Sequence, residues 1–388
     1  MNFDLSDEQK MLADSAERYI RDRYPFEERR HIFSNPNGFS RQQWQHFADM
    51  GWLALGIPED CGGLGGGAFD QALLMEQLGG GLVVEPVVDT AILCARLLQA
   101  SENLELRERL LGRIAAGEVV LALAHQEGHS RHEYDTEVQT KARPVAGGWS
   151  LSGVKHRVFH GGSADHWLVS AEIEGTGDLA LFLVDRHPIG ANLESYELID
   201  GSRAADIVFD HVMVAESALL LRGEATQEAL EEALDHAVLA MSAACLGSME
   251  FVMALTADYL KTRIQYGKPL AQFQVLQHRM AEMFIETDQA RSMLYSAIRA
   301  FESGDAAARR QSVSGAKVIV ARAQYFVSGQ GIQLHGGIGT TDEYVVGHHY
   351  KAAVMYDKRF GDSEFHLDRS NTDLGLADGQ RLRGALYA

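Results

Sequence analysis

The spacing of apolar residues changes twice along the chain and divides it into three parts. In residues 1–118 apolar positions recur at steps of three and four, which predicts a bundle of helices. Ser6 stands three residues before Gln9 and suits the N-cap of the first of these helices. In residues 119–222 the period falls to two, and in residues 223–388 the helical period returns. We therefore predict a helical domain, a β domain and a second helical domain.

The middle and last parts each contain regular runs that define the fold class. Short alternating or apolar runs, separated by Gly, Asp and Asn, predict strands of a small sandwich or barrel at 149–153, 166–170 and 179–184. In the last part, two seams step by three and four residues from Val238 to Tyr259 and from Leu276 to Ala297. Such seams are typical of long, nearly antiparallel helices in a four-helix bundle. The predicted class is α+β, with helices, strands and helices in that order.

Composition restricts the classes of function. The 388 residues carry a net charge of −19, with acidic residues spread along the chain, so nucleic acid is a poor partner. The three cysteines, Cys61, Cys94 and Cys245, are far apart and form neither a CxxC pair nor a disulfide framework. No segment reaches the roughly 18 apolar residues that a spanning helix needs, and no leader pattern precedes the first helix. We expect a cytoplasmic protein without a metal site and outside the membrane.

A glycine-rich stretch from Pro58 to Gly67 interrupts the first helical part. It lacks the spacing and the Lys-Ser/Thr ending of a phosphate loop, so we interpret it as a bend between helices.

Two polar segments in the last part carry the candidate chemistry. The first, 261–274, reads KTRIQYGKPLAQFQ, and the second, 333–344, reads QLHGGIGTTDEY. Arg263 falls in the last turn of a helix, where a positive charge suits the helix dipole, and the paired glycines let backbone N–H groups approach a pyrophosphate closely. Taken singly, each segment also fits an ordinary helix end.

Together the two segments resemble the signature regions of the acyl-CoA dehydrogenase family, RxQFGxPLxxFQxxQ and QxxGGxGxxxEY. The resemblance runs from Phe3 to about Arg369 in the expected helix, strand, helix context. Within the family the chain looks most like the small subunit of pimeloyl-CoA dehydrogenase and similar partner subunits. The resemblance implies a tetramer, homomeric or mixed with a larger subunit, that takes part in the degradation of fatty or dicarboxylic acids.

The resemblance further implies that FAD lies at a boundary between two chains. An arginine at the position of Arg263 would pair with the FAD pyrophosphate of the neighbouring subunit, through the charge-assisted bonds that a guanidinium forms well. The other implied contacts are Tyr266, Gln274, Gln333, Gly336, Gly337, Gly339 and Ser130.

The β domain departs from the family pattern where relatives hold the flavin ring. The hydroxyl-bearing threonine of the first strand is Ala124, the stacking tryptophan is Arg157 and a second threonine is Phe159; Ser130 is retained. Each lost neutral hydrogen bond should weaken FAD binding by about 1 kcal/mol.

The catalytic base is the larger departure. Relatives place a glutamate over the α carbon of the thioester, and the two family positions for it hold Phe360 and Ala237 here. Asp362 and His236 are the nearest replacements, but two helical positions turn a side chain by about 200° and one by about 100°, so neither points at the same spot. His348 and His349 are adjacent and diverge on a helix, so we expect no metal pair.

Two functions remain open from the sequence. One is an active FAD-dependent dehydrogenase that oxidises an acyl-CoA thioester and passes electrons to an electron-transfer flavoprotein. The other is a non-catalytic subunit that supports the FAD of a larger partner; the residues at 124, 159, 237 and 360 favour it. A CoA-thioester reaction without net oxidation is a third reading.

Overall fold

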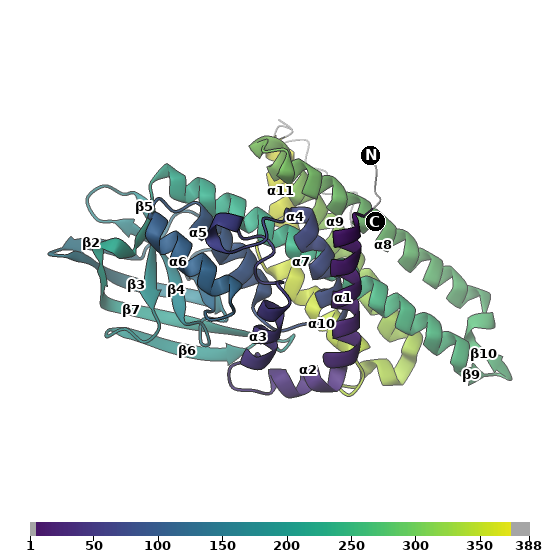
Figure 1. The fold of residues 1–388 in the computed structure, drawn as a ribbon. Coiled ribbons are helices and arrows are strands. Elements are labelled where there is room, and N and C mark those ends of the chain that lie inside the picture. Colours follow the sequence, from purple (N-terminus) through teal and green to yellow (C-terminus); the bar gives the residue numbers. More distant parts are fainter. Residues whose placement is uncertain (1–4, 374–388) are drawn as a thin grey trace.

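The computed structural model describes residues 5–373, and the order of its elements is helices, strands and helices (Figure 1). The first part consists of α1 (Asp7–Arg23), α2 (Phe26–Phe33), α3 (Arg41–Asp49), η1 (Glu59–Cys61), α4 (Ala68–Gly80), η2 (Val87–Cys94), α5 (Ala95–Gln99) and α6 (Leu104–Ala115). Ser6 caps α1 as predicted, because its side chain accepts from the Gln9 backbone while the Gln9 side chain accepts from the Ser6 backbone. The segment η2 is a π-helix, a form that is rare and often found at functional sites.

The glycine-rich stretch lies between α3 and α4, as the sequence predicts. Its backbone N–H groups bond within the loop: Gly63 donates to Pro58, Gly65 to Ile57 and Gly66 to Leu55. Those three donors are therefore not directed outward.

The strands form one eight-stranded sheet in the order β6-β7-β3-β2-β4-β5-β8, with β1 added parallel to β4. They are β1 (Leu121–Ala124), β2 (Lys141–Val145), β3 (Gly148–Phe159), β4 (His166–Ile173), β5 (Leu179–Asp185), β6 (Ala191–Glu197), β7 (Arg203–Ala215) and β8 (Leu219–Arg222). The longest pair, β3 and β7, has two register shifts, the second between Lys155 and Val158. The expected sandwich or barrel is thus built from one continuous sheet. The second register shift includes Arg157, which has no paired residue on β7.

The last part contains the helices α7 (Glu224–Thr262), α8 (Gln274–Glu302), α9 (Ala306–His335), α10 (Val346–Lys358) and α11 (Ser363–Asp373), with η5 (Gly336–Thr340) after α9. Much of each predicted seam is buried, including Val238, Cys245, Met283 and Leu294. The α+β class and the three-part architecture are confirmed.

Helix α7 corrects one expectation. Its most apolar window has a mean hydropathy of 1.8, so by length and composition it could cross a membrane, although 61% of that window is buried inside the fold. The same composition serves the core of a helical bundle, and burial of this extent is what a core helix shows.

Candidate functional site

The first signature segment forms an exposed tip at the end of α7. The backbone of Arg263 donates to the Tyr259 carbonyl at 2.9 Å and ends the helix, and its side chain is exposed. A short hairpin of β9 (Ile264–Gln265) and β10 (Lys268–Pro269) follows. Its turn holds Tyr266 at φ +52° and Gly267 at φ +80°, and Tyr266 is 91% exposed. Gln274, also exposed, begins α8.

The second signature segment ends α9. Gly336 has φ +68°, a conformation that favours glycine, and it turns the chain into η5. At Gly337 an added Cβ would meet nothing within 4 Å, whereas at Gly339 it would lie 2.7 Å from the Ile332 carbonyl oxygen. Gly337 therefore offers open backbone to a ligand, and Gly339 serves the packing of the turn.

An aromatic stack joins the two segments. The His335 ring lies 4.6 Å from the Tyr259 ring and 5.0 Å from the Tyr344 ring, between centroids. Because Arg263 follows Tyr259 by one helical turn and Gly336 follows His335 directly, the structure brings the two segments to the same end of the C-terminal bundle. We call this exposed set, Arg263, Tyr266, Gln274, Gln333, Gly336 and Gly337, the bundle tip.

Ser130 is not part of the bundle tip. It lies in the loop after β1, is 6% exposed and accepts from the Glu127 backbone N–H at 3.4 Å. The hairpin and the β domain lie at opposite ends of the molecule (Figure 1). One cofactor on one chain could not touch both the hairpin and the far strands, so the predicted contacts fall into two separate surfaces.

The face of the β domain that the resemblance assigns to the flavin ring is covered by the chain's own side chains. Arg157, at φ +52°, donates from Nε to Gln126 Oε1 at 2.8 Å and from a terminal nitrogen to the Ser130 carbonyl at 3.2 Å. The Arg359 guanidinium lies 3.9 Å from the Phe159 ring centroid and 4.5 Å from that of Phe360. It is a cation held between two aromatic faces.

Asp89 fixes this arrangement. Its carboxylate forms an ion pair with Arg359, and both residues are buried, at 4% and 9% exposure. Asp89 stands on η2, so the π-helix places an acid opposite the link between α10 and α11. Arg359, Asp89, Phe159 and Phe360, which we call the plug, thus bridge all three parts of the chain.

The plug leaves too little room for a flavin ring. The cavity that it shares with Arg157 and Gln126 has a volume of about 20 Å³, enough for about one water molecule. Cofactor pockets usually measure about 300 Å³ or more. The ring end of FAD therefore does not fit this chain as it stands, whereas the bundle tip presents exposed donors suited to a pyrophosphate.

The positions proposed for a base hold no free acid. Phe360 and Ala237 are buried, at 3% and 0% exposure. Asp362 accepts from the Phe365 backbone N–H at 3.0 Å, which caps α11, and lies 3.9 Å from Arg131. Burial lowers the pKa of His236 to about 3, and its ring lies 4.9 Å from that of Phe301. Asp362 and His236 lie on different elements.

The adjacent histidines of α10 diverge as expected. His348 Nδ1 faces Arg29 at 3.4 Å, whereas His349 Nδ1 lies 2.7 Å from Ser248 Oγ. Within residues 5–373, no group of three His, Cys, Asp or Glu side chains is placed to hold a metal ion.

The sequence interpretation missed two acids, Asp89 and Glu133. Glu133 lines the same small cavity as Phe360, is 9% exposed, and its Oε2 has no hydrogen-bond partner. Neither acid belongs to a recognisable motif. Asp89 reaches the plug from the π-helix Val87–Cys94, a conformation that no pattern in the sequence predicts.

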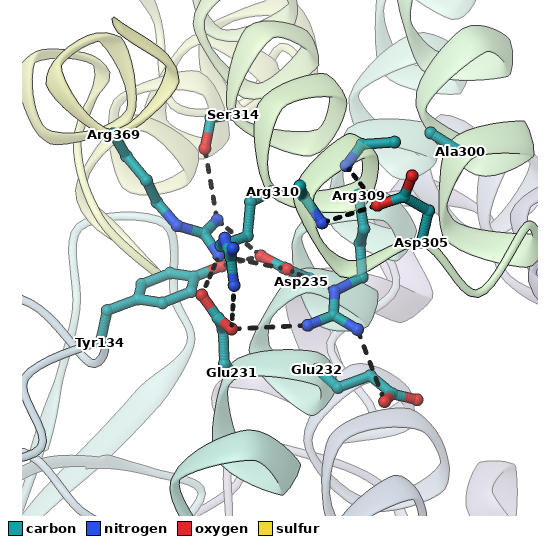
Figure 2. Close-up of polar contacts among 12 residues, drawn as sticks. Tyr134, Glu231, Glu232, Asp235, Ala300, Asp305, Arg309, Arg310, Ser314 and Arg369 are labelled. Carbon is teal, nitrogen blue, oxygen red and sulfur yellow. Dashed lines mark hydrogen bonds and ion pairs between the residues drawn. The ribbon is translucent and has the colours of Figure 1, made fainter. Parts of the chain in front are cut away.

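A wider cleft of about 660 Å³ lies between the loop after β1, α7 and α11. Its floor includes Tyr134, Glu231 and Arg369, which belong to the network of Figure 2. Within that network the fully buried Asp235 accepts from Tyr134 at 2.8 Å, Arg309 at 3.0 Å and Arg369 at 2.7 Å. Burial alone would raise the pKa of Glu231, but the hydrogen bond from Arg369 lowers it. The buried acids and bases of this floor already satisfy one another.

Acidic side chains outnumber basic ones in the lining of the cleft. It includes six carboxylates against two arginines: Glu133, Asp135, Glu224, Glu228, Glu231 and Asp368, with Arg310 and Arg369. Like charges repel at close range in a partly dry cleft, so this lining disfavours the phosphate groups of a CoA nucleotide.

Comparisons with known proteins agree with the fold. The family model described as acyl-CoA dehydrogenase, N-terminal domain, matches residues 6–118, and the model of the C-terminal domain of the same family matches residues 227–374. The chain is 27% identical over 331 residues to the mitochondrial isovaleryl-CoA dehydrogenase of Solanum tuberosum, covering 83% of this chain and 79% of that protein.

Two solved structures are similar over nearly the whole chain. A variant of the Tcur3481–Tcur3483 steroid ACAD is 28% identical with a TM-score of 0.85, covering 95% of this chain and 98% of that one. The ChsE4–ChsE5 complex from Mycobacterium tuberculosis is 23% identical with a TM-score of 0.87, covering 97% and 99%.

Proposed function

Because the chain belongs to the acyl-CoA dehydrogenase family, we propose that it is the FAD-supporting, non-catalytic subunit of a heteromeric acyl-CoA dehydrogenase. In this assembly the bundle tip meets the nucleotide part of an FAD whose ring lies in a larger partner subunit. The complex removes two hydrogens from the α and β carbons of an acyl-CoA, and the bound flavin supplies the hydride acceptor.

The plug is the observation that carries this proposal. Asp89, Phe159, Arg359 and Phe360 fill the place of the flavin ring with a buried ion pair between aromatic faces. Removing either Asp89 or Arg359 would leave a buried charge without its partner, which is costly. Replacement of the family residues by small side chains would instead have left a void at this position.

The bundle tip supports the other half of the proposal. It keeps the nucleotide-facing residues that the family resemblance identifies there, with Tyr266 in place of the Phe of the motif, and it is exposed on the single chain. Apolar side chains around it are exposed as well, including Ile264 at 61%, Val275 at 62% and Phe284 at 61%. Exposed apolar groups beside a charged donor fit a subunit interface that closes over a cofactor.

The relatives support the heteromeric form. The structure that is 28% identical to this chain carries the names of two proteins, Tcur3481 and Tcur3483. We propose a similar pairing here, as in the small subunit of pimeloyl-CoA dehydrogenase. The partner would bind the acyl-CoA and deliver electrons to an electron-transfer flavoprotein during fatty or dicarboxylic acid degradation. The buried thiols of Cys61, Cys94 and Cys245 fit a reducing cytoplasm.

One observation favours the alternative, an active dehydrogenase. Glu133 places a buried carboxylate in the same small cavity as Phe360, and one of its oxygens lacks a partner. If the plug opened on binding FAD, Glu133 would supply a carboxylate beside the family position of the base. Replacing Glu133 with Gln would then abolish turnover by the chain alone.

The deciding experiment compares the chain alone with the chain co-expressed with a larger family member that keeps the glutamate. We expect the purified chain to be colourless and the complex to hold one FAD per pair, reduced on addition of acyl-CoA. Flavin absorbance and subunit stoichiometry measure both. One FAD per subunit in the chain alone, bleached by an acyl-CoA, would overturn the proposal.

A further inference from the structure

A separate cavity lies between the start of the glycine-rich stretch, α5, α6 and α7. Its volume is about 350 Å³, within the range of small-molecule sites. The charged residues of its lining are two arginines, Arg96 and Arg107, and one carboxylate, Glu232. Arginines therefore outnumber acids here, the reverse of the wider cleft described above, although the whole chain carries a net charge of −19. We call it the arginine cavity.

Arg96 is fixed in the lining by several contacts. Its guanidinium forms an ion pair with Glu232, in which Nε donates to Oε1 at 2.9 Å, and a terminal nitrogen donates to Gln99 Oε1 at 3.4 Å. It also lies 5.9 Å from the ring centroid of Phe301. Glu232 lies 3.5 Å from Arg309 as well, so this one carboxylate serves two arginines. The orientation of Arg96 is thus set before a ligand arrives, and Glu232 balances its charge only in part.

Arg107, on α6, is held more loosely. Its carboxylate partner is Asp60, which lies 3.5 Å away and has a side chain that is 70% exposed. Ion pairs of this exposed kind contribute little, because water competes for both charges. The oxyanion of a ligand can therefore replace Asp60 at Arg107 at small cost.

We propose that the arginine cavity binds the carboxylate or phosphate group of a small molecule with a short apolar body. The oxyanion lies between Arg96 and Arg107, because guanidinium groups match the geometry of both oxyanions with two parallel hydrogen bonds. Pro58, Ala100 and Ala229 supply the apolar part of the lining. The site uses no residue of the bundle tip or the plug, so binding there requires neither FAD nor a partner subunit and does not rest on the proposed function.

This site involves the glycine-rich stretch without making it a phosphate loop. The N–H groups of Gly63, Gly65 and Gly66 bond within the loop. The stretch instead contributes Pro58 to the lining and Asp60 to the exchangeable ion pair. The anion is thus recognised by side chains of α5 and α6 and not by the backbone of the loop.

The test titrates the full chain, alone and at constant ionic strength, with butyrate, butyl phosphate and neutral butyramide by calorimetry. Each anion should bind at least about 10-fold more tightly than butyramide, the ratio that about 1.4 kcal/mol from a charge-assisted hydrogen bond provides. The tighter of the two anions identifies the group that the site prefers. Arg107→Ala should remove this 10-fold advantage of the anions. Arg113→Ala, further along α6 and paired with Glu118, is the matched control and should leave the affinities unchanged.

Four results would overturn the proposal. Failure of both anions to bind, or butyramide that binds as tightly as they do, would show that the arginines are not engaged. An unchanged affinity in Arg107→Ala would place the anion elsewhere, and an equal loss in Arg113→Ala would reduce the effect to the general charge of α6. Should Arg107→Ala fail to fold, Ala229→Leu fills the same cavity from α7. A loss of about 10-fold for both anions in that variant supports the proposal, and unchanged binding refutes it.

Discussion

The bundle tip and the plug lie in the same chain and have opposite characters. At the bundle tip the side chains expected to meet a dinucleotide are intact and face outward, from Arg263 to Gly337. At the plug the positions expected to meet the flavin ring hold bulky residues that bind one another, Arg359 and Phe159 among them. A chain that had lost its cofactor altogether would have no reason to keep the first set. The difference is what the proposed FAD-supporting role requires, in which this chain contributes one half of a shared site and its partner the other.

The largest expected effect comes from opening the plug. Replacing Asp89 with Asn, Phe159 with Thr, Arg359 with Tyr and Phe360 with Glu removes the ion pair and both rings that fill the crevice. We expect the purified chain to change from no bound flavin to a measurable fraction of one FAD per subunit, read from visible absorbance. Arg359→Lys alone keeps the charge and the filling and should remain colourless. A colourless quadruple variant that is folded by circular dichroism would show that the bundle tip of one copy and the opened crevice of another cannot hold one cofactor between them.

Breaking the plug from one side should be costly in stability. Asp89→Ala leaves the buried Arg359 guanidinium without its ion pair, and we expect a loss of about 3–5 kcal/mol in the free energy of unfolding. Urea denaturation measures it. The double variant Asp89→Ala with Arg359→Leu should recover most of the loss, because no charge is then left unpaired. A single variant as stable as the parent would mean that the pair is not formed in solution.

Glu85, which lies behind the plug, should also make the free energy of unfolding depend on pH. Burial raises the pKa of Glu85 from 4.5 to about 7. Its folded value exceeds the unfolded one, so the folded state holds the extra proton between these values and stability falls as the pH rises through that window. The protonated Glu85 contributes about 3 kcal/mol to the free energy of unfolding at low pH, and this contribution is lost as the pH rises to about 7. Glu85→Gln should flatten the slope of the unfolding free energy between pH 5 and 7, apart from the part due to Glu76, whose pKa burial also raises to about 7.

At the bundle tip the expected effect is smaller and appears only in the assembly. Arg263→Ala should leave the stability of the single chain within about 0.5 kcal/mol, since the side chain is exposed. In the complex it should weaken FAD binding by about 2 kcal/mol, roughly 30-fold, through loss of a charge-assisted bond. Flavin fluorescence during dilution measures it. Lys261→Ala, two residues earlier and also exposed, is the control. If the two variants weakened FAD binding equally, Arg263 would act only through its positive charge and not through a specific bond to the cofactor.

Local sequence patterns predict the fold, but they do not predict the plug. Helical and strand periods depend on neighbours a few residues apart, which is why the α+β order and the cap at Ser6 were predictable. The pair of Asp89 and Arg359 joins residues 270 positions apart, and no local pattern connects them. The same holds for Glu133, whose position beside Phe360 depends on the packing of a loop against α11. The sequence showed that Phe360 and Phe159 replace the family residues, but not that both rings pack against an Arg359 paired with Asp89.

Helix α7 has a mechanical consequence for how this chain can change. Its 39 residues form one rod of roughly 58 Å, with Asp235, buried beneath the acidic cleft, toward one end and Arg263 just beyond the other. Inserting or deleting a residue between them would turn one site against the other by about 100°. Insertions and deletions in α7 are therefore disfavoured as long as either site is in use. Either site can still diverge through substitution of its side chains without a change in the length of the helix.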